Sequence, residues 1–277
     1  MSESPARLAD DDLTRTSDLI YRWTGMTFGE TKRYYIERRI AERMKRTGRD
    51  TSRAYLAFAA ADLGEREALI NAFTINETYF YREEHQFAAL ARQILPALAA
   101  ERRPGDRIRI WSMPCSTGEE AYSIAIWLLE NWRLVDAYNI EIVGSDIDTH
   151  ALAMAREGRY SARALARLPE PLIAGYFEPE HRQTRRIIAD LRESVQFTVA
   201  NLVDRATLVD QGLFDVILCR NLLIYFDDAA RTLAADNLFE RLNPGGYLAL
   251  GHSESMARIS DRFTTVRLDD AIVYRRA

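Results

Sequence analysis

RIRIWSMPCSTGEEAYSIAIWLLEN (residues 107–131) predicts a strand, a loop and a helix in direct succession. The first seven residues alternate apolar side chains, as strands do, and Gly118 opens a helix of mostly apolar character that continues to Asn131. The same pattern recurs along the chain, with strands predicted at 140–145, 214–219 and 245–251 and helices at 149–157 and 227–242. Such alternation predicts a mostly parallel, doubly wound α/β sheet with helices on both faces.

Two regions flank this pattern. Upstream, capping residues and terminal glycines predict helices at 10–24, 31–47, 53–61, 65–74 and 83–100. We therefore expect an all-helical N-terminal domain over 1–80 and an α/β domain over 81–277. Near the end, FTTVRLDDAIVYRR (263–276) predicts two strands that turn at Asp269 and Asp270 and form an antiparallel edge. Residues 185–191 and 195–200 predict a hairpin, and with it a small β-subdomain at about 183–200.

The composition excludes several classes of protein. With 47% hydrophobic and 28% charged residues, the 277-residue chain is neither disordered nor collagen-like. Cys115 and Cys219 lie far apart and have no CxxC or CxxH partner, which argues against a disulfide framework or a zinc site. The start, MSESPARLADDD, is too polar for a signal peptide, and no apolar run approaches the roughly 20 residues that span a bilayer. We expect a soluble, cytoplasmic protein without membrane insertion.

Charge is distributed unevenly. The net charge of −4 argues against a general nucleic-acid binder. Residues 32–53 are nevertheless strongly basic, and the spacing of Arg39, Arg43 and Arg46 places these three side chains on one face of the predicted helix 31–47. This face is either a solvated surface or a docking surface for an acidic partner.

In a parallel sheet the ligand binds beyond the carboxyl ends of the strands. No GxGxxG or GxxxxGK[ST] motif is present there, which disfavours a dinucleotide or a phosphate cradle. Glu119 and Glu120 stand instead in the first loop, so a ligand without phosphate and with positive charge is favoured. S-adenosylmethionine has these properties, and Asp146, at the end of the second strand, is in the usual place for a ribose acceptor. These features together favour a class I methyltransferase.

Five motifs carry a family resemblance. They are NETYFYRE (76–83), WSMPCSTGEEAYS (111–123), SDID (145–148), CRNLLIYF (219–226) and LNPGGYLALGHSE (242–254). Their order and sequence closely resemble the CheR family, bacterial methyltransferases that esterify glutamates on chemotaxis receptors. Two departures flank the STGEE core, since the family usually has Gly at the place of Pro114 and Pro at the place of Ala121.

The resemblance implies a role for individual residues. Arg82 and Tyr225 would be catalytic, touching the methyl-accepting carboxylate, although Arg82 could equally hold the carboxylate of the cofactor. S-adenosylmethionine, with S-adenosylhomocysteine as product, would be held by Asn76, Thr78, Arg82, Glu120, Asp146, Asn201, Leu202, Cys219, Arg220 and Asn221.

The resemblance also implies a partner. The helical domain, with Arg39, Arg43 and Arg46, would face the acidic coiled coil of a methyl-accepting chemotaxis receptor. The predicted hairpin is short and lacks glycines, so we expect recognition that does not depend on a receptor C-terminal tail.

The implied chemistry needs no base. A glutamate carboxylate, with a pKa near ~4.3, is already ionised at neutral pH and would attack the sulfonium methyl in line. In agreement, the four histidines are scattered without metal-ligand spacing, so no metal site is predicted; they are His85, His150, His181 and His252.

Two alternatives remain open at this point. One is a catalytically silent regulator that binds S-adenosylmethionine and docks on receptors. The other, a nucleic-acid methyltransferase, is disfavoured because CRNLLIY (219–225) replaces the [ND]PP[YFW] expected for amino methylation. No exposed heptad seam is present, so we expect a monomer.

Overall fold

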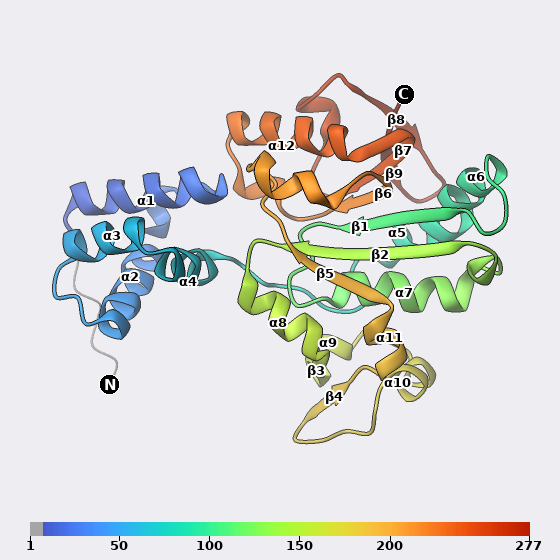
Figure 1. Cartoon of the computed structure of the whole chain (residues 1–277), viewed down its shortest axis with the longest axis horizontal. Helices are drawn as coiled ribbons and strands as arrows, with labels where there is room; N and C mark the ends of the chain where they lie inside the picture. The colour runs from blue at the N-terminus through green and yellow to red at the C-terminus, as the bar shows by residue number, and fades with distance from the viewer. Residues whose placement is uncertain (1–7) are drawn as a thin grey trace.

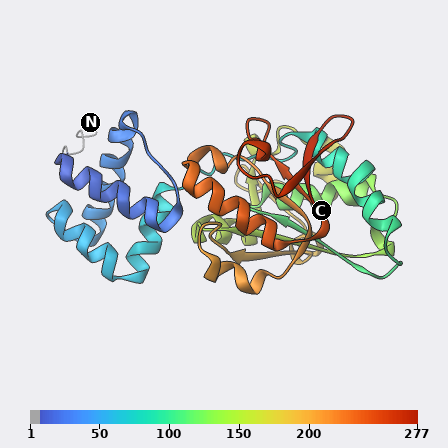
Figure 2. The same cartoon turned by 90° about the horizontal axis from the view of Figure 1, so that it is seen from above.

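The computed structural model describes residues 8–277, so most of the polar segment that disfavours a signal peptide lies outside the described residues. The chain forms a helical part and an α/β part that lie side by side and are joined by one extended segment (Figures 1 and 2). No helix in residues 8–277 is long and apolar enough to cross a membrane.

The helical part consists of four helices around a core of their own. Its helices are α1 (Asp10–Thr24), α2 (Arg33–Thr47), α3 (Ser52–Ala61) and α4 (Leu63–Phe73), with a 3-10 turn, η1 (Glu30–Lys32), before α2. The predicted ends are confirmed at Gly25 and Gly48, whose left-handed backbone closes α1 and α2. The core is made of Leu8, Ile20, Ile36, Ile40, Tyr55, Leu56, Ala59, Leu69 and Phe73.

The helix predicted over 83–100 is present but contains a change of winding. It runs as α5 (Glu84–Ala89), a π-helical turn η2 (Leu90–Ile94) and α6 (Leu95–Ala100). Pro96 stands in the first turn of α6, where its missing N–H is compatible with a wider turn before it.

A seven-stranded sheet forms the centre of the α/β part. Its strands are β1 (Arg107–Ser112), β2 (Asn139–Asp146), β5 (Val195–Val199), β6 (Phe214–Cys219), β7 (Leu242–Leu250), β8 (Phe263–Arg267) and β9 (Ile272–Arg276). The order is β5-β2-β1-β6-β7-β9-β8, and every pairing is parallel except β7 with β9 and β9 with β8. The predicted parallel sheet with an antiparallel edge is confirmed.

Helices cover both faces of this sheet. One face packs against the helix 84–100, α7 (Glu119–Asn131) and α8 (Thr149–Glu157), and the other against α12 (Asp228–Arg241). On the face covered by α12, Trp111 and Phe214 are fully buried, and their rings stack with centroids 4.7 Å apart. The remaining 3-10 turns are η3 (Val135–Ala137), η4 (Arg205–Gln211), η5 (Leu223–Tyr225) and η6 (Met256–Arg258).

The predicted hairpin between 185–191 and 195–200 is wrong. β5 instead pairs with β2 in parallel, and Ala189–Glu193 is a short helix, α11. The small sheet is formed by β3 (Arg159–Ser161) and β4 (Thr184–Arg186), which follow α8 and enclose α9 (Ala162–Leu165) and α10 (Glu170–Tyr176). β5 is an edge strand whose apolar and polar side chains alternate, and a short alternating run does not distinguish such a strand from one of a hairpin.

Candidate active site

A cleft opens at the carboxyl ends of β1, β2 and β6, beside the helical part of the chain. It has two adjoining compartments, whose shared walls are Ile75, Pro114, Ser116 and Asn221. Nine of the ten predicted cofactor contacts line it, namely Asn76, Thr78, Arg82, Glu120, Asp146, Asn201, Leu202, Arg220 and Asn221. The tenth, Cys219, is the last residue of β6. Its side chain is fully buried, and it is not among the residues that line the cleft.

Asp146 is fixed at the end of β2 by backbone amides. Its Oδ2 accepts from the N–H of Ser116 at 2.7 Å and its Oδ1 from the N–H of Asp148 at 2.9 Å. Only 4% of the residue is exposed, and this burial raises the pKa of the carboxyl to about 6, against the opposing effect of the two amides. The carboxylate is therefore rigid and poorly solvated, and it faces the cleft.

Glu120 and Arg220 form a buried ion pair on the floor of the cleft. Arg220 Nη1 lies 2.7 Å from Glu120 Oε2, and Arg220 Nη2 lies 3.2 Å from Glu83 Oε2. Ser112 donates to the other oxygen of Glu120 at 2.7 Å. Burial raises the pKa of Glu120, whereas the Arg220 guanidinium holds the pKa of Glu83 below its ordinary value. Arg220 Nε is buried and has no hydrogen-bond partner within residues 8–277.

The segment that joins the two parts of the chain forms one wall. Asn76 donates from Nδ2 to Asp148 Oδ2 at 2.7 Å and accepts from the Ser116 hydroxyl at 2.9 Å. Thr74 donates to the same oxygen of Asp148. Because Asp148 also caps α8 through the N–H of Ala151, this wall is tied to the first turn of that helix.

Asn201 and Leu202 form the opposite wall, after β5. Asn201 donates from Nδ2 to the carbonyl of Trp23 at 2.7 Å, so a predicted cofactor contact also joins the two parts of the chain. Leu202 is buried and presents apolar surface to the cleft.

The two predicted catalytic residues line different compartments of the cleft, Tyr225 the one with Asp146 and Arg82 the one with Arg220. Arg82 is half-buried and donates from Nη1 to the carbonyl of Glu77 at 2.7 Å. Burial raises the pKa of Tyr225, and the positive charge of Arg82 opposes this shift. At neutral pH the phenol is therefore a hydrogen-bond donor.

The loop that carries Tyr225 is held by a carboxylate that the sequence reasoning did not assign. Glu254 accepts from the N–H groups of Asn221, Leu223 and Gly251, at 2.8, 2.7 and 2.9 Å. Asn221 has a left-handed backbone (φ 60°), and these bonds hold it in that conformation. The signal was available, because Glu254 ends the motif LNPGGYLALGHSE, but its position suggested neither a ligand nor a charge partner.

The three arginines of α2 do not share one environment. Arg43 forms a bidentate pair with Glu65, with Nε to Oε1 at 2.9 Å and Nη2 to Oε2 at 2.5 Å, and is mostly buried. Arg39 lies 3.4 Å over the ring of Tyr35 and donates to a backbone carbonyl. Arg46 is exposed. Helical spacing predicted a common face, but it does not show which of these guanidiniums a neighbouring helix engages.

Comparison with known proteins gives the family. The model "CheR methyltransferase, SAM binding domain" matches residues 76–272, and "CheR methyltransferase, all-alpha domain" matches residues 11–74. The chain belongs to the CheR methyltransferase family. It is 45% identical to chemotaxis protein methyltransferase 2 of Vibrio cholerae over 96% of this chain and 93% of that protein. It is 34% identical to chemotaxis protein methyltransferase 2 of Pseudomonas aeruginosa, covering 90% and 88%, and 35% identical to the Salmonella typhimurium enzyme, covering 93% and 88%.

The cleft of this CheR-family methyltransferase fits S-adenosylmethionine, its cofactor. Asp146 supplies a carboxylate for hydroxyl donors, and Leu202, Leu222 and Phe226 supply apolar surface. Arg220 lines the cleft and its Nε is a buried donor without a partner in residues 8–277, which fits a residue that binds a carboxylate of the cofactor. The lining also includes Thr24 and Met26 from the helical part, which the motifs did not predict because both lie outside them.

Proposed function

We propose that this chain transfers the methyl group of S-adenosylmethionine to side-chain carboxylates of glutamates on chemotaxis receptors. The observation that carries the proposal is that Arg82 and Tyr225, a cation and a phenol donor, line the two adjoining compartments of the same cleft as Asp146 and Arg220. The family relatives support the pathway, because their names are chemotaxis protein methyltransferases.

The acceptor side is suited to an ionised carboxylate. A carboxylate needs no base at neutral pH, so the residues at the mouth have only to position it. Arg82 keeps donors available beyond the one bonded to Glu77, and charge-assisted bonds from a guanidinium to a carboxylate are among the strongest available. The Tyr225 hydroxyl would hold one carboxylate oxygen and leave the other directed at the methyl group.

The cofactor side is suited to the remaining polar groups. S-adenosylmethionine supplies an electrophilic methyl group on a sulfonium. Asp146 would accept from its ribose hydroxyls, while Arg220 Nε would bind its carboxylate and Asn76, Thr78 and Asn221 would line the path between the two ends. Leu202 and Asn201 would flank the base. Glu120 keeps Arg220 in place by the buried pair.

The docking side is the face of α2. Arg38 and Arg46 are exposed and line a groove with Arg39, Glu42 and Arg43 that extends to His150 at the start of α8. We assign the attraction of an acidic receptor surface to Arg46 and Arg39. Arg43, which we expected to take part, has its charge committed to Glu65.

A methyl-transfer assay tests the proposal. The chain is incubated with radiolabelled S-adenosylmethionine and membranes that carry receptors of the same cell, and the label is then released as methanol by mild base. We expect base-labile label with the wild type and a large loss with Arg82→Ala, since the variant lacks the cation at the mouth. Cofactor binding without any base-labile label would overturn the proposal in favour of a silent regulator.

A further inference from the structure

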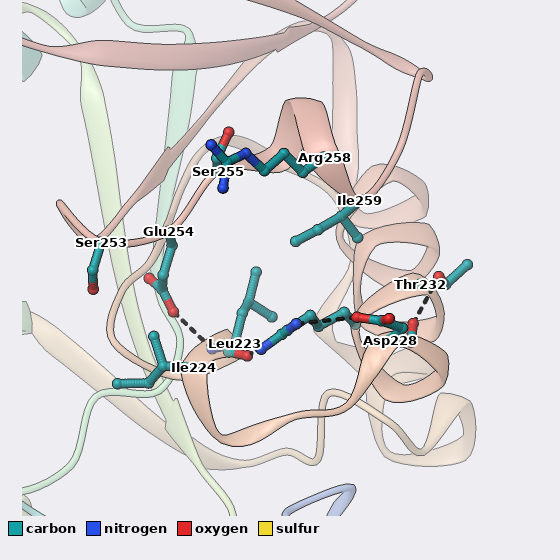
Figure 3. A pocket seen from close by; sticks show the side chains of 10 residues that line it. Leu223, Ile224, Asp228, Thr232, Ser253, Glu254, Ser255, Arg258 and Ile259 are labelled. Atoms are coloured by element: carbon teal, nitrogen blue, oxygen red, sulfur yellow. Dashed lines mark hydrogen bonds and ion pairs between the residues drawn. The ribbon is translucent and has the colours of Figure 1, made fainter.

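A second cavity lies behind the loop that carries Tyr225. It has a volume of about 410 Å³ and opens between η5, the start of α12 and the segment that follows β7 (Figure 3). Its lining is Leu223, Ile224, Asp228, Arg231, Thr232, Ser253, Glu254, Ser255, Arg258 and Ile259. None of these residues lines the cofactor cleft.

The two cavities share one wall. In the loop after β6, Asn221, Leu222 and Tyr225 face the cofactor cleft, whereas Leu223 and Ile224 face the second cavity. A group bound in the second cavity would therefore be separated from Tyr225 only by the loop that carries this residue. Ile224 is 45% exposed, so its side chain is accessible beside the mouth of the cleft.

The charged side chains of the second cavity differ in their hydrogen-bond and ion-pair partners. Glu254 is saturated by backbone N–H groups, and Asp228 pairs with Arg231 at 3.1 Å. Arg231 also donates from Nε to the carbonyl of Leu223 at 3.0 Å. Arg258, by contrast, is exposed, and its side chain has no hydrogen-bond or ion-pair partner within residues 8–277. Figure 3 shows its side chain extended beside Ser255, and among the charged side chains of this lining it is the one without a partner in residues 8–277.

The chemistry of the rim fits one kind of side chain. Leu223, Ile224 and Ile259 offer apolar contact, and Arg258 offers a cation at the opening. A glutamate or aspartate side chain matches both parts of this lining. Its methylene groups contact apolar surface, and its carboxylate binds a guanidinium. Ser253 and Ser255 add hydroxyls at the same opening.

We propose that this second cavity is a specificity subsite that takes an acidic side chain of the receptor helix, with Arg258 as its ion partner. The proposal rests on the proposed function. Successive turns of a helix are about 5.4 Å apart, and side chains three or four positions apart lie on one face. A helix that presents one glutamate to Tyr225 therefore presents a neighbouring side chain over Ile224 and toward Arg258. The substrate would be a glutamate with a second acid one turn away.

Two variants at Arg258 and one control test the subsite. Arg258→Ala removes the cation, Arg258→Glu reverses it, and Arg267→Ala removes an exposed arginine on β8 outside the cavity lining. We expect Arg258→Ala to raise the KM for receptor membranes about 3- to 5-fold, with kcat and the calorimetric Kd for S-adenosylmethionine unchanged. Arg258→Glu would raise KM further, because it repels the acid. Arg267→Ala would leave all three at wild-type values.

The salt dependence of KM and cosedimentation with receptor membranes distinguish a failure of the subsite from a failure of the proposed function. The KM of the wild type would rise with salt more steeply than that of Arg258→Ala, which a loss of folding would not produce. An unchanged KM in both Arg258 variants, or an equal rise in Arg267→Ala, would overturn the subsite. Cosedimentation with receptor membranes applies even if the wild type labels nothing. Weaker binding of Arg258→Glu would then support the subsite while the proposed function fails, and binding equal to wild type would overturn it.

Discussion

The buried carboxylate of Asp146 predicts a pH dependence of cofactor affinity. Burial at the end of β2 raises its pKa to about 6, even though two backbone amides favour the ionised form. The hydroxyls of a ribose are donors, so the ionised carboxylate binds them and the protonated one competes as a donor itself. The affinity for S-adenosylmethionine should therefore fall as the pH is lowered through 6.

The size of the effect follows from the titration. With a pKa of about 6, the ionised fraction falls from about nine tenths at pH 7 to about one tenth at pH 5. The Kd of the wild type should then rise about tenfold between these two pH values. Asp146→Asn should bind more weakly at pH 7, by roughly tenfold or more, because two charge-assisted bonds are lost. Its own Kd should change much less with pH.

Calorimetric titration at pH 5, 6, 7 and 8 measures both profiles. The comparison with Asp146→Asn matters because burial also raises the pKa of Glu120 and Glu254, whose contributions are common to both proteins. A wild-type profile parallel to that of Asp146→Asn would refute the assignment of Asp146. The sign for stability is also fixed. Because the folded pKa lies above the unfolded one, the ligand-free wild type should lose about 3 kcal/mol relative to Asp146→Asn as the pH rises from 3.8 through 6.

Three further variants test other parts of the structure. Arg43→Ala should lower the melting temperature without changing the salt dependence of receptor binding. Arg46→Ala should make receptor binding less dependent on salt and leave the melting temperature unchanged. The reverse pattern would contradict the assignment of docking to Arg46. Gly251→Ala should lower kcat and stability together, because a Cβ there meets Asn221 at 2.8 and 3.0 Å and the Glu254 carboxylate at 2.9 Å, and wild-type values in both would show that these groups can move. Glu120→Gln should cost about 3 kcal/mol of unfolding free energy in a denaturant titration, since it leaves Arg220 with a weaker partner; a loss under 1 kcal/mol would indicate that Glu83 compensates.

Much of the fold was predictable because its signals are local. Alternating strands and helices gave the parallel sheet, and glycines at positions 25 and 48 gave the ends of two helices. Motif residues at the ends of neighbouring strands had to converge, as the carboxyl ends of parallel strands meet at one edge. The sequence could therefore place Asp146, Arg220 and Asn221 in one cleft.

The features that the sequence did not predict depend on contacts between residues far apart in the chain. VQFTV (195–199) alternates apolar and polar side chains, as a hairpin strand and an edge strand of a parallel sheet both do, and only its pairing with β2 across the fold distinguishes them. The ion pair of Arg43 was likewise not predictable, because Glu65 lies on another helix and its carboxylate is not visible in the spacing of α2. Thr24 and Met26 were missed since the contact between the helical part and the cleft is not encoded in any motif.

The most direct measurement is the identification of the methylated atom. Receptor membranes are incubated with the chain and S-adenosylmethionine that carries a trideuterated methyl group, and the receptor peptides are sequenced by mass spectrometry. We predict a deuterated methyl ester on glutamate side chains that mild base removes, and its loss with Arg82→Ala. Label on lysine, on nucleic acid or on no receptor peptide, in a preparation that binds the cofactor, would contradict glutamate methylation by this cleft.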